Sequence, residues 1–291
     1  MPTLALSMPF IIIGIIAALL IDDPQTRAYS VAACIVPLVF AYIFRPQIEW
    51  WWFTRNPPKL HKKMRGVLDR FFPMFSKLSQ ENRLRFENRM ALYMLSKSYE
   101  KKVIDVVPED LKGLIAANAI QLTFGLEEYL SPKFETIVLY PSQFPSPTIP
   151  KFHASEVFKD GDFGGLIFAL DHIIPGLRDS QRYNIVMHEF VNLLWIQNEW
   201  SEKAFLEHAT PRNLLLLAKI RGMSLAQVQK YLGKPTINFF AVAIEHFFAK
   251  PESFKKLLPD LYKTISKQLN QDPLEESNPV IIALEIEEKT S

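Results

Sequence analysis

Several residue types are scarce in this chain, beginning with cysteine. Cys34 is the single cysteine among 291 residues, which excludes an intramolecular disulfide bond and a zinc site built from thiolates. Excess charge of one sign is also missing, since 33 basic and 31 acidic residues leave a formal net charge of +2. This balance gives no support to a nucleic-acid partner. What is abundant is apolar material, at 48% of residues, which is enough for a large core.

The first fifty residues lack charge over long stretches. Residues 4–20 form an uncharged apolar run about one membrane thickness long, and a second apolar run covers residues 29–44. No lysine or arginine precedes Arg27, so the start does not have the basic region of a cleaved signal peptide. The pattern predicts a retained hairpin of two transmembrane helices. A pair of short buried core helices is the alternative.

Basic residues follow the second apolar run and predict its orientation. Six lysines and arginines lie between residues 45 and 65 against one acid, Glu49, and three consecutive tryptophans, Trp50 to Trp52, lie among them. Cytoplasmic flanks of membrane helices are enriched in lysine and arginine, and tryptophan is enriched at the membrane interface. The sequence therefore predicts a protein of the cytoplasmic membrane whose larger part faces the cytoplasm.

The rest of the chain predicts a mostly helical α+β domain. Helical spacing and capping residues indicate helices at about 79–97, after Pro108 and, with breaks, over 181–269. Two short β-rich stretches at 136–140 and 165–170 predict a small sheet. The expected organisation has three parts: residues 1–66 as hairpin and basic linker, 67–272 as the globular domain, and 273–291 as an acidic tail. We expect this tail to be solvated, with packing on the domain or on a partner as the alternative.

Residues 188–192 match a zinc-peptidase helix in which one metal ligand is changed. In an H-E-x-x-H helix, two histidines four residues apart bind one zinc ion, and the glutamate activates the metal-bound water. His188 and Glu189 are present here, but Asn192 stands where the second histidine would be. A neutral amide oxygen is a poor zinc ligand beside imidazole or carboxylate. Alone, this pattern is weak, because a His-Glu pair in a helix is more often a buried histidine beside a solvated acid.

A second segment gives the pattern its context. Tyr231 is followed seven residues later by Asn238 and then by Phe239, Phe240 and Ala241. Further motifs in the same order extend the pattern over roughly residues 70 to 272: 78–85, 115–119, 137–141, 183–190, 231–245 and 271–273. Together they resemble the Mlc titration factor A family of zinc peptidases and the related catalytic domain of anthrax lethal factor. The resemblance implies a zincin-like metallopeptidase fold, with the N-terminal hairpin as an addition.

The same resemblance implies roles for five residues. His188 matches the first zinc ligand, Glu189 matches the general base, and Tyr231 matches the tyrosine that supports the oxyanion or the bound water. Asn192 and Asn238 stand where the family has its second and third ligands, a histidine and a glutamate. Catalytic zinc needs three strong protein ligands, so we expect zinc to bind weakly or not at all. Instead, His188 and the two asparagines are predicted to hydrogen-bond one another in a metal-free cavity.

Other candidates for the site are less well placed in the sequence. Glu245 is predicted to be too far away to replace a ligand, because it lies seven residues, or roughly 10 Å of helix, beyond Asn238. Ser155, His153 and Asp171 have the residue types of a hydrolase triad, but no nucleophile-elbow sequence surrounds the serine.

These observations favour a membrane-anchored, cytoplasm-facing member of the peptidase family that binds a peptide or regulatory protein without cleaving it. Because members of the family bind the transcriptional repressor Mlc, the resemblance implies a transcriptional regulator as one possible partner. The alternatives are an active zinc-dependent aminopeptidase with rearranged ligands and Glu189 as base, and a structural protein of the membrane. The predicted peptide groove lies beside one β-rich stretch: Gly165, Leu166, Ile167, Phe168, Ala169 and Leu170.

Overall fold

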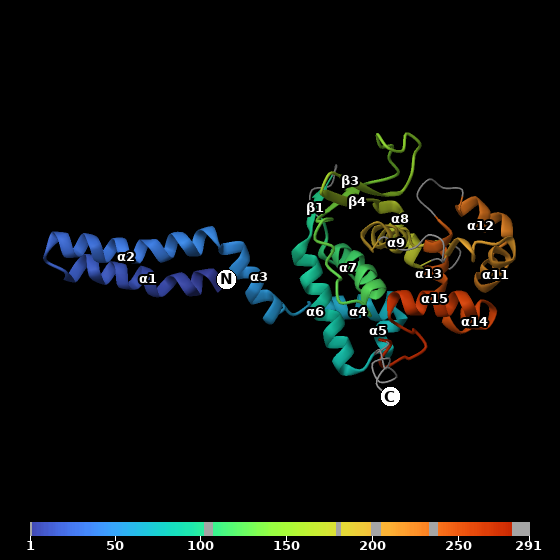
Figure 1. Cartoon of the computed structure of the whole chain (residues 1–291), viewed down its shortest axis with the longest axis horizontal. Helices are drawn as coiled ribbons and strands as arrows, with labels where there is room; N and C mark the ends of the chain where they lie inside the picture. The colour runs from blue at the N-terminus through green and yellow to red at the C-terminus, as the bar shows by residue number, and fades with distance from the viewer. Residues whose placement is uncertain (1, 102–106, 179–181, 199–204, 233–237, 281–291) are drawn as a thin grey trace, which may run out of the picture. The chain divides into compact units, whose positions relative to one another are not determined.

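The computed structural model divides into two compact units, Met1–Pro58 and Lys59–Ser291 (Figure 1). It describes residues 2–101, 107–178, 182–198, 205–232 and 238–280. The domain start expected at residue 67 falls inside helix α4 (Lys62–Phe71), which belongs to the second unit. Met64 and Leu68 of this helix are buried in the core, so the second unit includes residues expected to form a linker.

The first unit consists of three helices, α1 (Pro2–Leu20), α2 (Pro24–Ile43) and α3 (Arg45–Arg55). The side chain of Asp23 caps α2 by accepting a hydrogen bond from the Thr26 amide at 2.7 Å. α1 packs along α2, yet most of their apolar side chains are exposed. Both helices are long and apolar enough to cross a membrane.

The described residues of the second unit form one mixed four-stranded sheet. Its strands are β1 (Ser98–Lys101), β2 (Thr136–Tyr140), β3 (Ser155–Asp160) and β4 (Phe163–Ala169). The order is β1-β2-β4-β3, in which β3 is antiparallel to β4 and the other pairs are parallel. β2 and β4 match the two predicted β-rich stretches. The two strands that the sequence missed lie at the edges, where polar side chains interrupt the apolar pattern that marks a buried strand.

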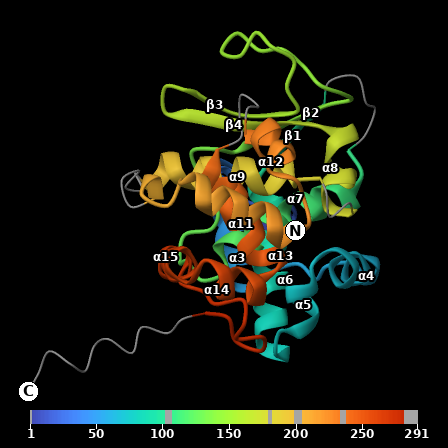
Figure 2. The same cartoon turned by 90° about the vertical axis from the view of Figure 1, so that its right-hand side faces the viewer.

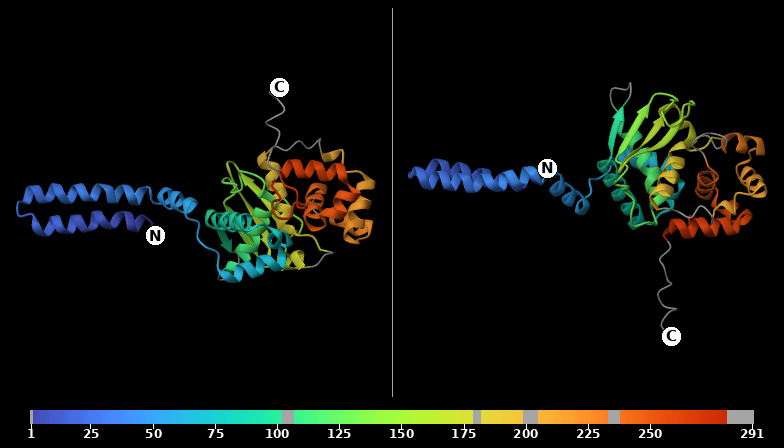
Figure 3. Two further views of the ribbon diagram at one scale, coloured as in Figure 1. Left: turned by 90° about the horizontal axis from the view of Figure 1, so that it is seen from below. Right: turned by 45° about the horizontal axis from the view of Figure 1, so that its top comes forward.

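The other regular elements in the described part of the second unit are helices, as the α+β prediction requires. Their bounds are α5 Pro73–Lys77, α6 Gln80–Ser96, α7 Glu109–Thr123, α8 Leu170–Arg178, α9 Ile185–Asn198, α11 Pro211–Arg221, α12 Leu225–Leu232, α13 Phe239–Ala249, α14 Pro251–Leu257 and α15 Pro259–Leu269. Figures 2 and 3 show α7 and α9 next to the sheet, with α13 to α15 farther from it. α9 contacts α7, α13, β3 and β4, so it lies at the centre of the core.

The first part of the predicted acidic tail is attached to the second unit. The Asn82 side-chain amide donates to the Ser277 carbonyl oxygen at 3.0 Å and to Asn278 Oδ1 at 3.1 Å. Val280 forms an isolated bridge with Gln271, whose side chain donates to two carbonyl oxygens at the end of α7. These contacts attach residues 273–280 to the second unit, while the side chains of residues 275–278 are exposed. Residues 281–291 lie outside the described part of the chain.

A candidate peptidase-like site on helix α9

The position of α9 is set by Asn184, which precedes the helix. Its side-chain oxygen accepts hydrogen bonds from the backbone amides of Val186 and Met187, at 3.1 and 3.2 Å, as an N-cap does. Its side-chain amide donates to Asn118 Oδ1 on α7. Both asparagines are buried. This anchoring holds His188 and Glu189 in the interior, where their exposed fractions are 0% and 1%.

His188 lies between an acid and a phenol. Its Nε2 is 2.7 Å from Glu245 Oε2, and its Nδ1 is 3.3 Å from the Tyr231 hydroxyl. Glu245 also accepts from the Asn184 backbone amide at 3.0 Å, while its other oxygen pairs with Arg221. A neutral imidazole satisfies both contacts when Nε2–H donates to the carboxylate and the tyrosine hydroxyl donates to Nδ1. We call these four side chains, Arg221, Glu245, His188 and Tyr231, the His188 network.

The contact with Glu245 corrects the prediction that this residue lies too far from the site. α9 and α13 pack with opposite directions, because Asn192 pairs with Asn238 at one end and Asn184 pairs with Glu245 at the other. Two turns along α13 therefore bring Glu245 to the level of His188 instead of moving it away. Sequence spacing measured the distance from Asn238 but did not give the direction of the partner helix.

Glu189 belongs to a second network, which reaches the surface. Its Oε1 accepts a hydrogen bond from Ser155 Oγ on β3 at 2.7 Å, and its Oε2 accepts from the Asn192 amide at 3.1 Å. The Asn238 amide then donates to Asn192 Oδ1 at 2.6 Å, while Asn238 Oδ1 caps α13 by accepting from the Ala241 amide. Asn192 is half-buried and Asn238 is exposed, so this pair lies at the mouth of the site.

The role of Ser155 in this network was not predicted. The sequence analysis considered Ser155 as a nucleophile with His153 and Asp171. In the structure, His153 Nε2 contacts Glu156 Oε2 at 3.1 Å, and Asp171 contacts His172 at 2.7 Å. The three residues are therefore not brought together as a triad. Because β3 is polar, the sequence did not identify it as a strand. It therefore gave no indication that Ser155, the first residue of β3, faces Glu189.

The donor groups at the family's metal position do not fit a zinc ion. Both ring nitrogens of His188 face other residues, and the two asparagines use their amide groups on each other and on Glu189. Within the described ranges, no group of three or more His, Cys, Asp or Glu side chains could hold a metal. The predicted bond between the two asparagines is present, but His188 contacts Glu245 and Tyr231 instead of the amides.

The charges around His188 are balanced by Glu245 and Arg221. Burial alone would raise the pKa of Glu245, but the hydrogen bond with His188 and electrostatic interactions with His188, Arg221 and His246 hold it below its ordinary value. Burial raises the pKa of Tyr231 well above its ordinary value, and nearby Glu245 adds to this effect. The phenol is therefore neutral at physiological pH and available as a hydrogen-bond donor. Tyr183 stacks on its ring, with centroids 3.9 Å apart.

The strand order of the sheet places the accessible strand edge away from residues 165–170, beside which the peptide groove was predicted. β4 holds Gly165 to Ala169 and pairs with β2 on one side and β3 on the other, so a peptide has no open edge of β4 to join. The predicted groove needs this correction: the edge strand beside α9 is β3. An apolar pocket of about 350 Å³ opens next to the asparagine pair. Its lining is Asn192, Trp195, Ile196, Phe205, Leu206, Ala209, Asn238, Phe239 and Phe240.

A buried histidine beside the site makes stability depend on pH. Burial, with a smaller contribution from Arg221, lowers the pKa of His246 to about 4, although Glu245 and two backbone carbonyl groups favour the charged form. The unfolded chain takes up this proton near pH 6.5, whereas the folded chain does so only near pH 4. The free energy of unfolding should therefore fall by about 1.4 kcal/mol per pH unit from this group as pH drops through that window.

Chemical denaturation of the natural chain and of His246→Gln, measured from pH 7.5 to 4, tests this effect. The glutamine variant should have the shallower dependence, because it has no proton to gain. His208→Gln, at a half-buried position on another segment, is the control and should keep the natural slope. Equal slopes for the natural chain and His246→Gln would contradict the assignment.

Comparison with known proteins identifies the family of the chain. The family described as glucose-regulated metallo-peptidase M90 matches residues 48–269. Mlc titration factor A of Serratia proteamaculans is 24% identical over 258 residues, covering 78% of this chain and 94% of the relative. An uncharacterized protein of Synechocystis sp., slr2042, is 23% identical over 232 residues, covering 72% and 84%. Because the family match spans most of the chain, the protein belongs to the glucose-regulated metallo-peptidase M90 family.

Proposed function

We propose that this protein is a membrane-anchored member of the M90 family that binds an extended peptide or a regulatory protein without cleaving it. One observation carries the proposal. The groups at the metal position of the family, namely His188, Asn192 and Asn238, are engaged in hydrogen bonds with protein partners. Hydrolysis by this family's chemistry needs three strong ligands and a metal-bound water, and this donor set does not supply them.

The edge of the sheet supports peptide binding. β3 lies at the end of the sheet and contacts α9, so its outer edge offers backbone groups to an added strand. The apolar pocket beside Asn192 and Asn238 is large enough for one bulky side chain of such a peptide. Backbone pairing would give affinity, and the pocket would give a preference for leucine, phenylalanine or similar residues.

The N-terminal unit supports the anchor. α1 and α2 carry apolar side chains on their exposed surfaces, and basic residues follow them in the sequence. In this proposal the second unit faces the cytoplasm. The relative named Mlc titration factor A points to a transcriptional regulator as one candidate partner.

A panel of fluorescent decapeptides that differ only in one central residue tests the proposal on the full chain in detergent. We expect saturable binding that strengthens from glycine through leucine to phenylalanine, and no cleavage on prolonged incubation. Ala209→Trp should remove this preference by filling the pocket that Ala209 lines. Ala226→Trp, at an exposed position of α12, is the matched control and should bind normally.

Two results would overturn the proposal. One is hydrolysis by the natural chain that is lost in Glu189→Gln and accompanied by stoichiometric zinc. The other is the absence of saturable binding for every peptide in the panel. The first would favour a working metallopeptidase with altered ligands, and the second a structural role.

A further inference from the structure

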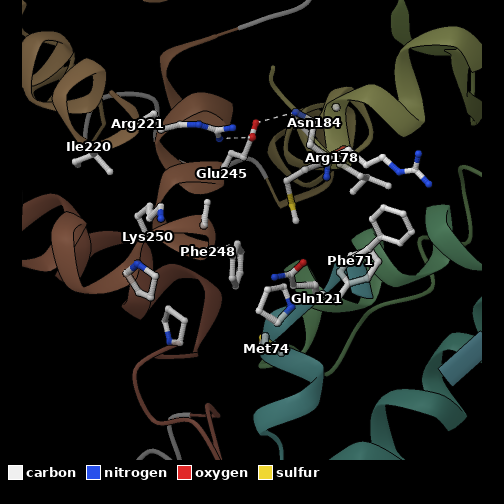
Figure 4. A pocket seen from close by; sticks show the side chains of 18 of the residues that line it. Phe71, Met74, Gln121, Arg178, Asn184, Ile220, Arg221, Glu245, Phe248 and Lys250 are labelled. Carbon is white, nitrogen blue, oxygen red and sulfur yellow. Dashed lines mark hydrogen bonds and ion pairs between the residues drawn. The ribbon is translucent and has the colours of Figure 1, made fainter. Parts of the chain in front are cut away.

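A second and larger cavity lies next to Glu245. Its volume is about 900 Å³, and it is open to solvent between α4, α8, α11, α13 and α14. Figure 4 shows Arg221, Ile220 and Lys250 on one side of it and Arg178 with Phe71 on the other. The pocket and the β3 edge of the proposed peptide site do not include these residues. Glu245, which also lines this cavity, contacts His188 of the candidate site.

Positive charge dominates the lining of this cavity. Six basic side chains line it against two carboxylates, those of Glu245 and Glu252. The six are Arg70, Lys77, Arg178, Lys219, Arg221 and Lys250. This excess differs from the near-neutral balance of the whole chain, whose net charge is +2. The local field therefore favours an anion with more than one negative charge.

Among the described residues, most of these cations have no carboxylate close enough to form an ion pair. Lys77 pairs with Glu276, and Arg221 pairs with Glu245. For Arg70, Arg178, Lys219 and Lys250, the described residues provide no acidic partner within 4.0 Å. Both Arg70 and Arg178 place their guanidinium groups 5.6 Å from the centre of the Phe71 ring, so two like charges lie near one aromatic side chain.

We propose that this cavity binds a small organic molecule that carries phosphate groups, and that its occupancy is coupled to His188 through Arg221 and Glu245. Phosphate matches the lining because guanidinium groups bind its oxygens in pairs and lysines add point charges. The apolar side chains of Phe71, Met74 and Phe248 provide contacts for the organic part of the ligand. The volume suits a molecule of metabolite size.

The coupling follows from Arg221 and Glu245, which both line the cavity and belong to the His188 network. Glu245 lines the cavity with one carboxylate oxygen on Arg221, while the other is 2.7 Å from His188 Nε2. An anion beside Arg221 competes with Glu245 for the guanidinium and repels the carboxylate. Both effects change the hydrogen bond between Glu245 and His188. The asparagine pair at the mouth of the peptide site belongs to the other network and is not part of this path.

Calorimetric titration of the full chain in detergent with inorganic pyrophosphate tests the binding step. We expect saturable binding that weakens by about tenfold or more in the double variant Lys219→Ala, Lys250→Ala. The control is Lys263→Ala, Lys267→Ala, which removes the same charge from exposed positions of α15 outside the cavity. Both pairs of lysines are exposed, so the variants should keep the melting temperature of the natural chain.

Nitrogen NMR of labelled histidine rings tests the coupling. Saturating pyrophosphate should move the His188 ring resonances in the natural chain and in the control variant, but not in Lys219→Ala, Lys250→Ala at the same concentration. Absence of saturable binding, or equal weakening in both double variants, would overturn the site. Binding that depends on Lys219 and Lys250 but leaves the His188 resonances unmoved would overturn the coupling.

Discussion

Asn192→His combined with Asn238→Glu is expected to yield a chain that retains close to one zinc ion per molecule after dialysis. The natural chain should retain far less, because His188 is the one strong ligand at the family's positions. Two added ligands should raise zinc affinity by several decades, given that losing even an outer-shell partner costs about 10–100-fold. Metal analysis of the folded proteins in detergent measures the difference directly.

The structure gives this expectation a geometric reason. Asn192 Oδ1 and the Asn238 amide already lie 2.6 Å apart, and Asn192 follows His188 by one helical turn. The new side chains would thus converge on the space beside His188. One ring nitrogen of His188 could bind the metal while the other stays on Glu245, the arrangement in which a carboxylate orients a zinc-bound histidine.

Two controls separate metal binding from other effects. Glu245→Gln added to the double variant should lower zinc affinity by about 10–100-fold, since the orienting carboxylate is lost. The single variant Asn192→His should bind zinc far more weakly than the double variant. A double variant that folds but retains no more zinc than the natural chain would show that these positions no longer converge as ligands.

Glu245→Gln in the natural chain is expected to destabilise the fold by roughly 3 to 5 kcal/mol. Arg221 and Glu245 have side chains that are 7% and 9% exposed, and His188 is fully buried. Glutamine keeps the shape of the side chain but removes the negative charge that faces the Arg221 guanidinium. Thermal unfolding in detergent should show a melting temperature lower by about 10 °C.

An exposed ion pair provides the comparison. Lys77 and Glu276 have side chains that are 48% and 57% exposed, so Glu276→Gln should cost less than about 1 kcal/mol. Both substitutions remove one carboxylate charge, and they differ in burial. If the two variants had equal stability, the His188 network would have no special part in holding α9 against α13.

The outline of the fold could be predicted because its buried elements have regular patterns. Ser79 caps α6, which matches the helix expected at about 79–97, and the apolar strands β2 and β4 lie where β-rich stretches were predicted. β1 and β3 were missed because edge strands carry polar residues that resemble loops. The attachment of residues 273–280 depends on contacts with Asn82 and Gln271, which no local pattern reveals.

For the candidate site, the family resemblance placed His188, Glu189, Asn192, Tyr231 and Asn238 close together, and the structure brings all five into one region. The sequence did not give their partners. Those partners come from β3, α11 and the far end of α13, at separations set by helix direction and strand order. The basic cavity could not be predicted from the sequence for the same reason. Its basic residues come from separate helices, and acidic residues elsewhere in the chain offset them in the net charge of +2.

The opposite directions of α9 and α13 arrange the site in two levels, one at the surface and one buried. At the surface, Asn192 and Asn238 join the helices by amide groups that other polar side chains could replace. One turn deeper, His188 and Glu245 join the same helices by a buried charged contact. The proposed loss of catalysis would then lie at the two outer positions, while the inner contact holds the helices together. The proposed function therefore requires no change in the packing of α9 against α13.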